Sequence, residues 1–198
     1  RGRGLALGYW QGATLTSSAS IIVNSDGTIT MLSGQVDLTG TRTTMQQIVA
    51  QEMQVPIENV TVRVGDTEST TYTDLSAGSR TGYSLGAAAH AACKDAISHL
   101  KIHAATQFEV DPADIEYTQG KFWVRENSEQ NVTLAALAQN STRRASGPIS
   151  GYGTVTRLQA AHQFAGHVVD VEVDIETGKV SILRYTTFQD VGKAINPV

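Results

Sequence analysis

Two segments of the sequence combine small residues, hydroxyl groups and an arginine immediately before an expected helix. The first is Thr39-Gly40-Thr41-Arg42, and the second is Ser76-Ala77-Gly78-Ser79-Arg80-Thr81. The first peptide groups of a helix present N–H donors and a partial positive charge, and glycine lets a ligand approach the backbone without a clash with Cβ. An arginine can bridge two phosphate oxygens. Together the segments predict a site for a ligand that carries more than one phosphate.

A purely structural interpretation of each segment remains open. Threonine and serine side chains cap many helices, and the arginines would then stay in solvent. For one such segment alone, this interpretation is the stronger one. Two segments of the same layout in one chain shift the balance towards a ligand site. The ligand would be an enzyme cofactor or, as the alternative, the phosphate ligand of a non-enzymatic binding or interaction module.

Other reactive residue types give no clear site. His99 and His103 lie four residues apart on one expected helix, but no third ligand accompanies them, so no metal site is predicted. Cys93 follows two alanines in the same helix and is expected to be a packing residue. No carboxylate stands out as a general base, since Asp170 and its acidic neighbours lie on the outer face of an expected strand.

The elements that would position the two segments follow from hydrophobic periodicity and turn residues. Each segment leads into a helix: the first runs from Thr43 to shortly before Pro56, and the second from Ser84 to about Ala105. A short helix capped by Thr133 is expected at residues 134–138, followed by a flexible loop at 140–153. Strands are expected at residues 5–9, 17–23, 28–32, 60–64, 115–117 and 121–124.

The C-terminal third carries the clearest strand pattern. Val169, Val171 and Val173 alternate with acidic residues, and a turn at residues 176–179 leads into a second strand at 180–189. A long antiparallel hairpin with one dry face is therefore expected. Strands that come in hairpins rather than in regular βαβ repeats predict the α+β class, with a mostly antiparallel sheet and helices packed on one face.

Length and composition limit the classes of function. A chain of 198 residues with 40% hydrophobic content can bury one core, so a single domain over residues 1–198 is expected. The net charge of -4, with lysines and arginines scattered, argues against nucleic acid or an anionic membrane as partner. No apolar run approaches a membrane span. The single cysteine excludes an internal disulfide and a cysteine-only iron–sulfur site within the chain.

Several short motifs follow one another along the chain. They lie at residues 34–43, 47–52, 66–67, 76–81, 86–88, 189–192 and 195–197. In this order and spacing they resemble the C-terminal part of the molybdenum-cofactor-binding large subunit of the xanthine dehydrogenase/aldehyde oxidase family, the molybdenum hydroxylases. The resemblance covers nearly the whole chain and is thinnest between residues 106 and 156.

The resemblance implies an oxidoreductase with a molybdopterin cofactor that carries molybdenum, in bacterial members usually as the cytosine dinucleotide. Such enzymes hydroxylate an aldehyde or N-heterocycle with oxygen derived from water. Many members have Gly-Gln-Gly where this chain has Leu38-Thr39-Gly40, with the glutamine amide near the metal's oxo ligand, so the first loop is identified as a variant. By motif match, the two cofactor-binding loops are Thr39, Gly40, Thr41 and Arg42, and Ser76, Ala77, Gly78, Ser79, Arg80 and Thr81.

The same resemblance implies parts that lie elsewhere. The family's general-base glutamate belongs to a Gly-Glu segment after the Asn-Pro motif, so it is expected beyond Val198 and no catalytic residue is assigned within the chain. A [2Fe-2S] group and FAD are expected on partner subunits or domains. Because an initiator methionine is also missing, the chain is expected to be a fragment of a larger cytoplasmic subunit, with the periplasm as alternative. The fragment is expected to be inactive alone, and an excised domain without a function of its own is a further alternative.

Overall fold

A computed structural model describes residues 1–143, 147–160 and 162–193. The described residues form two compact units, one made of residues 14–158 and the other of residues from 1–13 and 159–198. That the whole chain forms one domain, as expected from the sequence, stays a prediction, because two compact units can belong to one domain. The closing motif at residues 195–197 lies outside the described residues.

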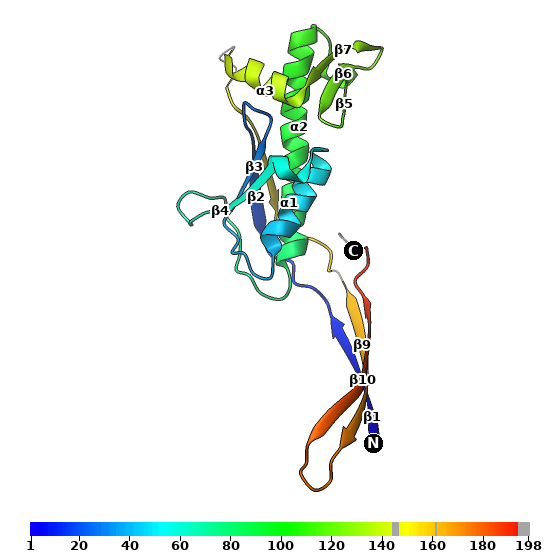
Figure 1. The fold of residues 1–198 in the computed structure, drawn as a ribbon. Coiled ribbons are helices and arrows are strands. Elements are labelled where there is room, and N and C mark those ends of the chain that lie inside the picture. Colours follow the sequence, from blue (N-terminus) through cyan, green and yellow to red (C-terminus); the bar gives the residue numbers. More distant parts are fainter. Residues whose placement is uncertain (144–146, 161, 194–198) are drawn as a thin grey trace. The chain divides into compact units, whose positions relative to one another are not determined.

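The larger unit contains a four-stranded sheet in the order β4-β3-β2-β8 (Figure 1). Strand β2 pairs antiparallel with both β3 and β8, whereas β3 and β4 are parallel and are joined through helix α1 and a short 3-10 helix at Ile57–Asn59. A parallel pair needs such a crossover, which a hairpin cannot provide. The elements are β2 (Ser17–Val23), β3 (Ile29–Ser33), α1 (Thr41–Glu52), β4 (Val60–Val64) and β8 (Ile149–Val155).

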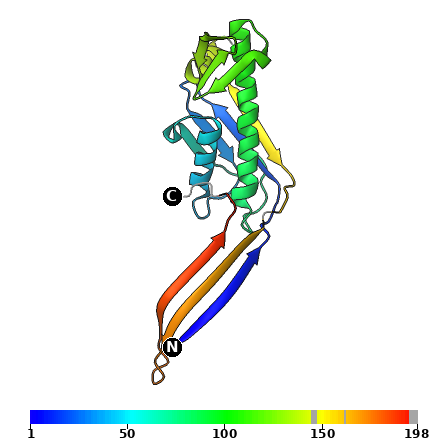
Figure 2. The ribbon, with the colours of Figure 1, turned by 90° about the vertical axis from the view of Figure 1, so that its right-hand side faces the viewer.

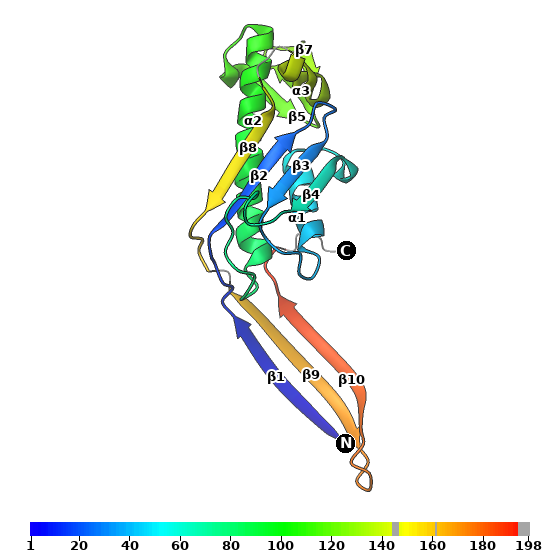
Figure 3. The ribbon, with the colours of Figure 1, turned by 90° about the vertical axis from the view of Figure 1, so that its left-hand side faces the viewer.

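The core of the larger unit lies between this sheet and the helices on one of its faces. Alternate strand residues such as Ile21 and Met31 are fully buried, as expected for a sheet with one covered face. Helix α2 (Gly86–Phe108) runs along β8 and β2 (Figures 2 and 3). A Cβ added at Gly151 or Gly153 of β8 would stand 2.2 Å from a backbone oxygen of α2. The glycines therefore let the strand approach the alanine-rich side of the helix.

A second, three-stranded antiparallel sheet in the order β5-β6-β7 follows α2. The Oγ1 of Thr133 accepts a hydrogen bond from the N–H of Ala136 at 3.2 Å, which confirms Thr133 as the cap of helix α3. The expected loop at 140–153 is wrong at both ends, because α3 continues to Arg143 and β8 begins at Ile149. Residues 144–146 of that loop lie outside the described residues. The elements are a 3-10 helix (Pro112–Asp114), β5 (Ile115–Thr118), β6 (Lys121–Val124), β7 (Asn127–Thr133) and α3 (Leu134–Arg143).

The smaller unit is an antiparallel sheet in the order β1-β9-β10, formed by β1 (Gly2–Trp10), β9 (Gln163–Val173) and β10 (Val180–Asp190). The expected hairpin is confirmed, and the Asp174 carboxylate accepts the N–H groups of Glu176 and Thr177 in its turn. The expectation of one dry face is wrong within the described residues of this unit. There Val173 is 44% exposed and Ile175 is 96% exposed, because the sheet has no second layer within the unit.

The fold class is α+β, as expected, with mostly antiparallel sheets and one parallel pair. Both α1 and α2 contact the four-stranded sheet and each other. In the part of the chain that the structure describes, no helix combines the length and the apolar composition needed to cross a membrane.

Candidate functional site

The two loops singled out in the sequence line one pocket of about 440 Å³ in the larger unit. Each loop ends at the start of a helix: the first leads into α1, and the second leads into a π-helical turn at Thr81–Leu85 that continues as α2. A π-turn of this kind is frequent at functional sites. The lining consists of Leu38, Thr39, Thr41, Thr44, Ser76, Ala77, Ser79, Thr81 and Gly82.

The pocket therefore contains part of the predicted set. Thr39, Thr41, Ser76, Ala77, Ser79 and Thr81 are in its lining, whereas Gly40, Arg42, Gly78 and Arg80 are not. Leu38, Thr44 and Gly82 also line the pocket, although they are not among the residues predicted to bind the cofactor. Thr44 follows Thr41 by three residues on the same helix and so shares its face, which is a signal that could have found it.

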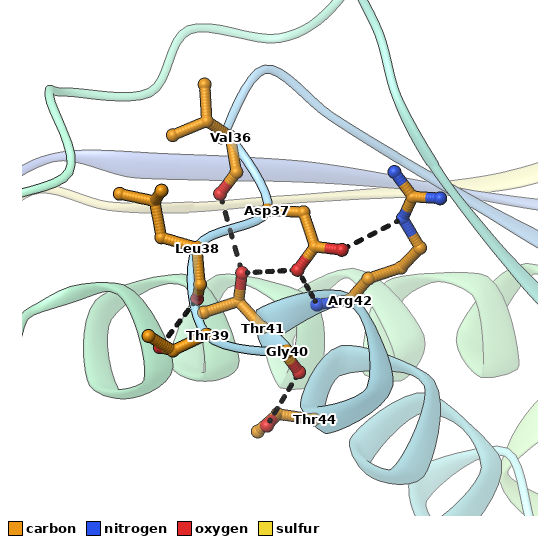
Figure 4. A network of polar contacts seen from close by, with 8 residues as sticks. All are labelled: Val36, Asp37, Leu38, Thr39, Gly40, Thr41, Arg42 and Thr44. Atoms are coloured by element: carbon orange, nitrogen blue, oxygen red, sulfur yellow. Dashed lines mark hydrogen bonds and ion pairs between the residues drawn. The ribbon is translucent and has the colours of Figure 1, made fainter.

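The first loop is shaped by the Asp37 carboxylate (Figure 4). Its Oδ1 accepts hydrogen bonds from the backbone N–H of Arg42 at 3.0 Å and from the Thr41 hydroxyl at 3.2 Å. Its Oδ2 lies 3.5 Å from Nε of Arg42. These contacts, led by the hydrogen bond from the backbone of Arg42, hold the pKa of Asp37 below its usual value. The carboxylate thus caps α1 and also pairs with the arginine that was expected to face a phosphate.

Both loops contain two consecutive residues in the left-handed region. Thr39 and Gly40 have φ angles of 57° and 80°, and Gly78 and Ser79 have φ angles of 62° and 60°. The region is ordinary for glycine, but a β-branched threonine adopts it only under strain. Of these four residues, Thr39 and Ser79 line the pocket, one from each loop. At Thr39 the residue type itself gives no indication of this conformation.

Arg80 is fully buried, and its guanidinium points into the protein. Nε donates to the Leu75 carbonyl at 2.7 Å, Nη1 to the Thr16 carbonyl at 3.4 Å and to Ser17 Oγ at 2.5 Å. Nη2 donates to Gln35 Oε1 at 2.7 Å and to the Asp74 carbonyl. Burial lowers the pKa of the guanidinium from its ordinary value, against the opposing effect of Asp74. All five N–H groups have partners, so this arrangement does not support a direct contact between Arg80 and a phosphate.

The side chains that line the pocket are suited to binding a ligand rather than to acid–base catalysis. Six of the lining residues carry hydroxyl groups, and none of the lining residues has an ionisable carboxyl, imidazole, thiol or amine. Hydroxyls can donate to phosphate or to a polar ring but cannot serve as a general base at neutral pH without a partner. Across the described parts of the chain, no three histidine, cysteine or acidic side chains gather into a metal site. A polar, anionic cofactor fits this lining, provided that any metal is carried by the cofactor itself.

The remaining reactive side chains lie elsewhere. His99 Nδ1 is 2.8 Å from the Ser150 carbonyl oxygen, and burial lowers the pKa of His103, with a smaller effect from His99. Cys93 is fully buried, which confirms it as a packing residue. Burial, with a further effect from Glu52, raises the pKa of its thiol to about 12. Cys93 therefore offers no reactive thiolate.

Comparison with known proteins identifies the family. The model of the molybdopterin cofactor-binding domain matches residues 1–198. The chain is 30% identical over 194 residues to the 6-hydroxypseudooxynicotine dehydrogenase complex subunit gamma of Paenarthrobacter nicotinovorans, covering 94% of this chain and 24% of that protein. It is 29% identical over 202 residues to the aldehyde oxidoreductase molybdenum-binding subunit of Escherichia coli (strain K12), covering 99% and 26%. The chain thus spans about a quarter of the length of these relatives.

Solved structures share the fold. Reconstituted CO dehydrogenase from Oligotropha carboxidovorans has a TM-score of 0.85 and 23% identity, over 99% of this chain and 26% of that chain. Quinoline 2-oxidoreductase from Pseudomonas putida 86 has a TM-score of 0.79 and 22% identity, over 99% and 28%. The resemblance found in the sequence is confirmed by the family match. This chain belongs to the molybdopterin cofactor-binding domain family.

Proposed function

We propose that the pocket between residues 38–44 and 76–82 holds the phosphates of a molybdopterin cytosine dinucleotide. The observation that carries this proposal is the convergence of both loops on one pocket of about 440 Å³. Two loops with hydroxyls and left-handed turns suit a ligand with two linked phosphates better than a single anion. The residues proposed to contact the cofactor directly are Thr39, Gly40, Thr41 and Arg42 of the first loop, and Ser76, Ala77, Gly78, Ser79 and Thr81 of the second.

The contribution of these residues is to bind and orient. The hydroxyls of Thr41, Ser79 and Thr81 would donate to phosphate oxygens, and the turn at Gly78 would let the backbone lie close to the ligand. Arg42 would add positive charge once a ligand competes with Asp37 for it. The bound cofactor would supply the oxidation–reduction chemistry by which water-derived oxygen is added to an aldehyde or N-heterocycle.

We further propose that residues 1–198 alone do not turn over substrate. The pocket lining has no side chain that could act as a general base, so the base would come from another part of the larger subunit. Electrons would leave through [2Fe-2S] and FAD groups on partner subunits or domains, because the one cysteine of this chain cannot hold such a cluster.

The test is to identify what the full-length subunit carries when it is purified with its partner subunits. Oxidation and acid hydrolysis should release pterin and cytidine nucleotide in equal molar amounts. Pterin without nucleotide would contradict the dinucleotide, and a protein that holds another phosphate compound but no pterin would overturn the proposed function. Residues 1–198 expressed alone should show no hydroxylase activity, and measurable turnover would contradict their assignment as a purely binding part.

A further inference from the structure

The buried Arg80 side chain joins three segments that are distant in the sequence. Its guanidinium binds carbonyls of Asp74 and Leu75 in its own loop, the Thr16 carbonyl and Ser17 hydroxyl at the start of β2, and the side chain of Gln35 after β3. Acceptors from three segments surround one planar donor group. This side chain therefore helps to hold the three segments together, in addition to the hydrogen bonds between Thr16 and Asp74.

The charge of Arg80 is not neutralised by a direct carboxylate partner. The carboxylate of Asp74 instead accepts the backbone N–H of Thr16 at Oδ2, at 3.0 Å, and the Tyr72 hydroxyl at Oδ1, at 2.8 Å. Burying a charged group among neutral acceptors is costly unless every donor is satisfied. The complete set of partners meets this condition, and the loss of one acceptor would leave a buried N–H without a partner.

Gln35 connects this network to the other wall of the pocket. Its side chain is 4% exposed, its Oε1 accepts from Arg80 at 2.7 Å, and its backbone N–H donates to Ser33 Oγ at 3.1 Å. Thr39 and Thr41 of the first wall follow within six residues along the chain. On the other side, Ser79 and Thr81 flank Arg80 and line the second wall. The Arg80–Gln35 hydrogen bond is thus a short link between the two walls.

We propose that Arg80 is a positioning residue, which through Gln35 fixes the spacing of the two pocket walls and does not itself bind the cofactor. This inference rests on the proposed function for the identity of the ligand, but not for the link between the walls. Arginine is suited to the role because its planar guanidinium group holds N–H donors in several fixed directions. Lysine keeps the charge but has all its donors on one nitrogen, so it cannot reach the acceptors of all three segments.

Hydrogen exchange in the full-length subunit from a host that cannot make the pterin tests the link without the cofactor. Gln35→Met removes the acceptor at similar size and should speed exchange of segments 34–41 and 74–82 by about tenfold, as expected for the loss of a hydrogen bond to a charged group. Arg80→Lys should do the same. Gln35→Glu keeps the acceptor and should stay within about twofold of wild type. Arg63→Met, which removes an exposed arginine on β4, is the matched control.

Pterin content in a host that makes the cofactor is the second readout. Gln35→Met and Arg80→Lys should each lower the retained pterin, whereas Gln35→Glu and Arg63→Met should keep it. The proposal is overturned if Gln35→Met leaves exchange of segment 74–82 and pterin content unchanged, or if Arg80→Lys behaves as wild type in both. If wild type retains no pterin but the exchange pattern holds, the proposed function fails and the positioning role stands.

Discussion

Thr39 shows most clearly how single residues build the pocket. It is β-branched, has a φ angle of 57°, and lies in the pocket lining beside Gly40. Strain at one residue persists only where the surrounding structure imposes it. Gln119 has a similar φ angle of 46° in the turn between β5 and β6, away from this pocket. Because only Thr39 lines the pocket, substitutions at the two positions distinguish the effect of backbone strain from the effect of ligand binding.

At the first of these positions, Thr39→Asn should raise the free energy of unfolding by about 1 kcal/mol, because asparagine tolerates the left-handed region. Gln119→Asn should stabilise the protein by a similar amount. Denaturant unfolding measures both effects. Only Thr39→Asn should lower the retained pterin, since only Thr39 lines the pocket. Equal pterin content in the two variants would show that the Thr39 side chain does not contribute to binding.

Six of the small and hydroxyl residues singled out in the sequence line the pocket, whereas neither of the two arginines does. A short side chain next to a tight turn can reach little beyond its own loop, so its place follows from the loop. The direction of Arg80 depends instead on acceptors such as Ser17 and Gln35, which are 63 and 45 positions away in the sequence. Only the tertiary fold brings these acceptors together, and local pattern could not indicate them.

At the scale of elements, close packing of β8 on α2 holds the helix that follows the second pocket loop against the sheet. Gly151→Ala should lower the free energy of unfolding by about 3 kcal/mol or more. The added Cβ would stand 2.2 Å from the Ala92 carbonyl oxygen and 2.4 Å from the Ala96 nitrogen, and neither backbone atom can move freely. Denaturant unfolding measures this loss of stability, with Gly82→Ala as the control variant.

Gly82→Ala is the matched substitution because nothing lies within 4 Å of the added Cβ. It should change the free energy of unfolding by less than about 1 kcal/mol. The expected direction is an increase, because alanine has a higher helix propensity than glycine. A Gly151→Ala variant as stable as Gly82→Ala would mean that β8 does not pack closely on α2.

The same contact explains which elements the sequence could predict. Strands with alternating apolar residues, such as β2 and β4, were predicted at residues 17–23 and 60–64, where they are found. Strand β8 has the sequence ISGYGTV, and its glycines were interpreted as a loop. They belong to a strand because a helix lies directly over them. Close approach to another element is not visible in local composition.

At the scale of the whole molecule, the buried core belongs to one unit. Every buried hydrophobic residue of the core, among the residues that the structure describes, lies between Ala19 and Ile149. The three-stranded sheet of the smaller unit exposes large side chains such as Leu7 and Ile182. A sheet without a packed face contributes little stability by itself. The two units should therefore differ strongly in their ability to fold alone.

Residues 14–158 expressed alone should fold cooperatively, with a free energy of unfolding within about 1 kcal/mol of that of the whole chain. The reason is that this segment contains the core and the complete pocket lining. Urea unfolding monitored by circular dichroism measures the difference. A segment that stays unfolded would show that the smaller unit is required for the core, as the expectation of a single domain over residues 1–198 implies.

The central claim is that the pocket between the two loops holds the cofactor, and blocking the pocket tests it most directly. Ala77 lines the pocket and is exposed, and Ala136 is an exposed alanine on α3. The measurement is the pterin retained per polypeptide by the full-length subunit carrying Ala77→Trp or Ala136→Trp. With the pocket filled by the indole, Ala77→Trp should lose at least about tenfold in retained pterin, while Ala136→Trp should keep the wild-type amount. Equal retention in both variants would contradict the account.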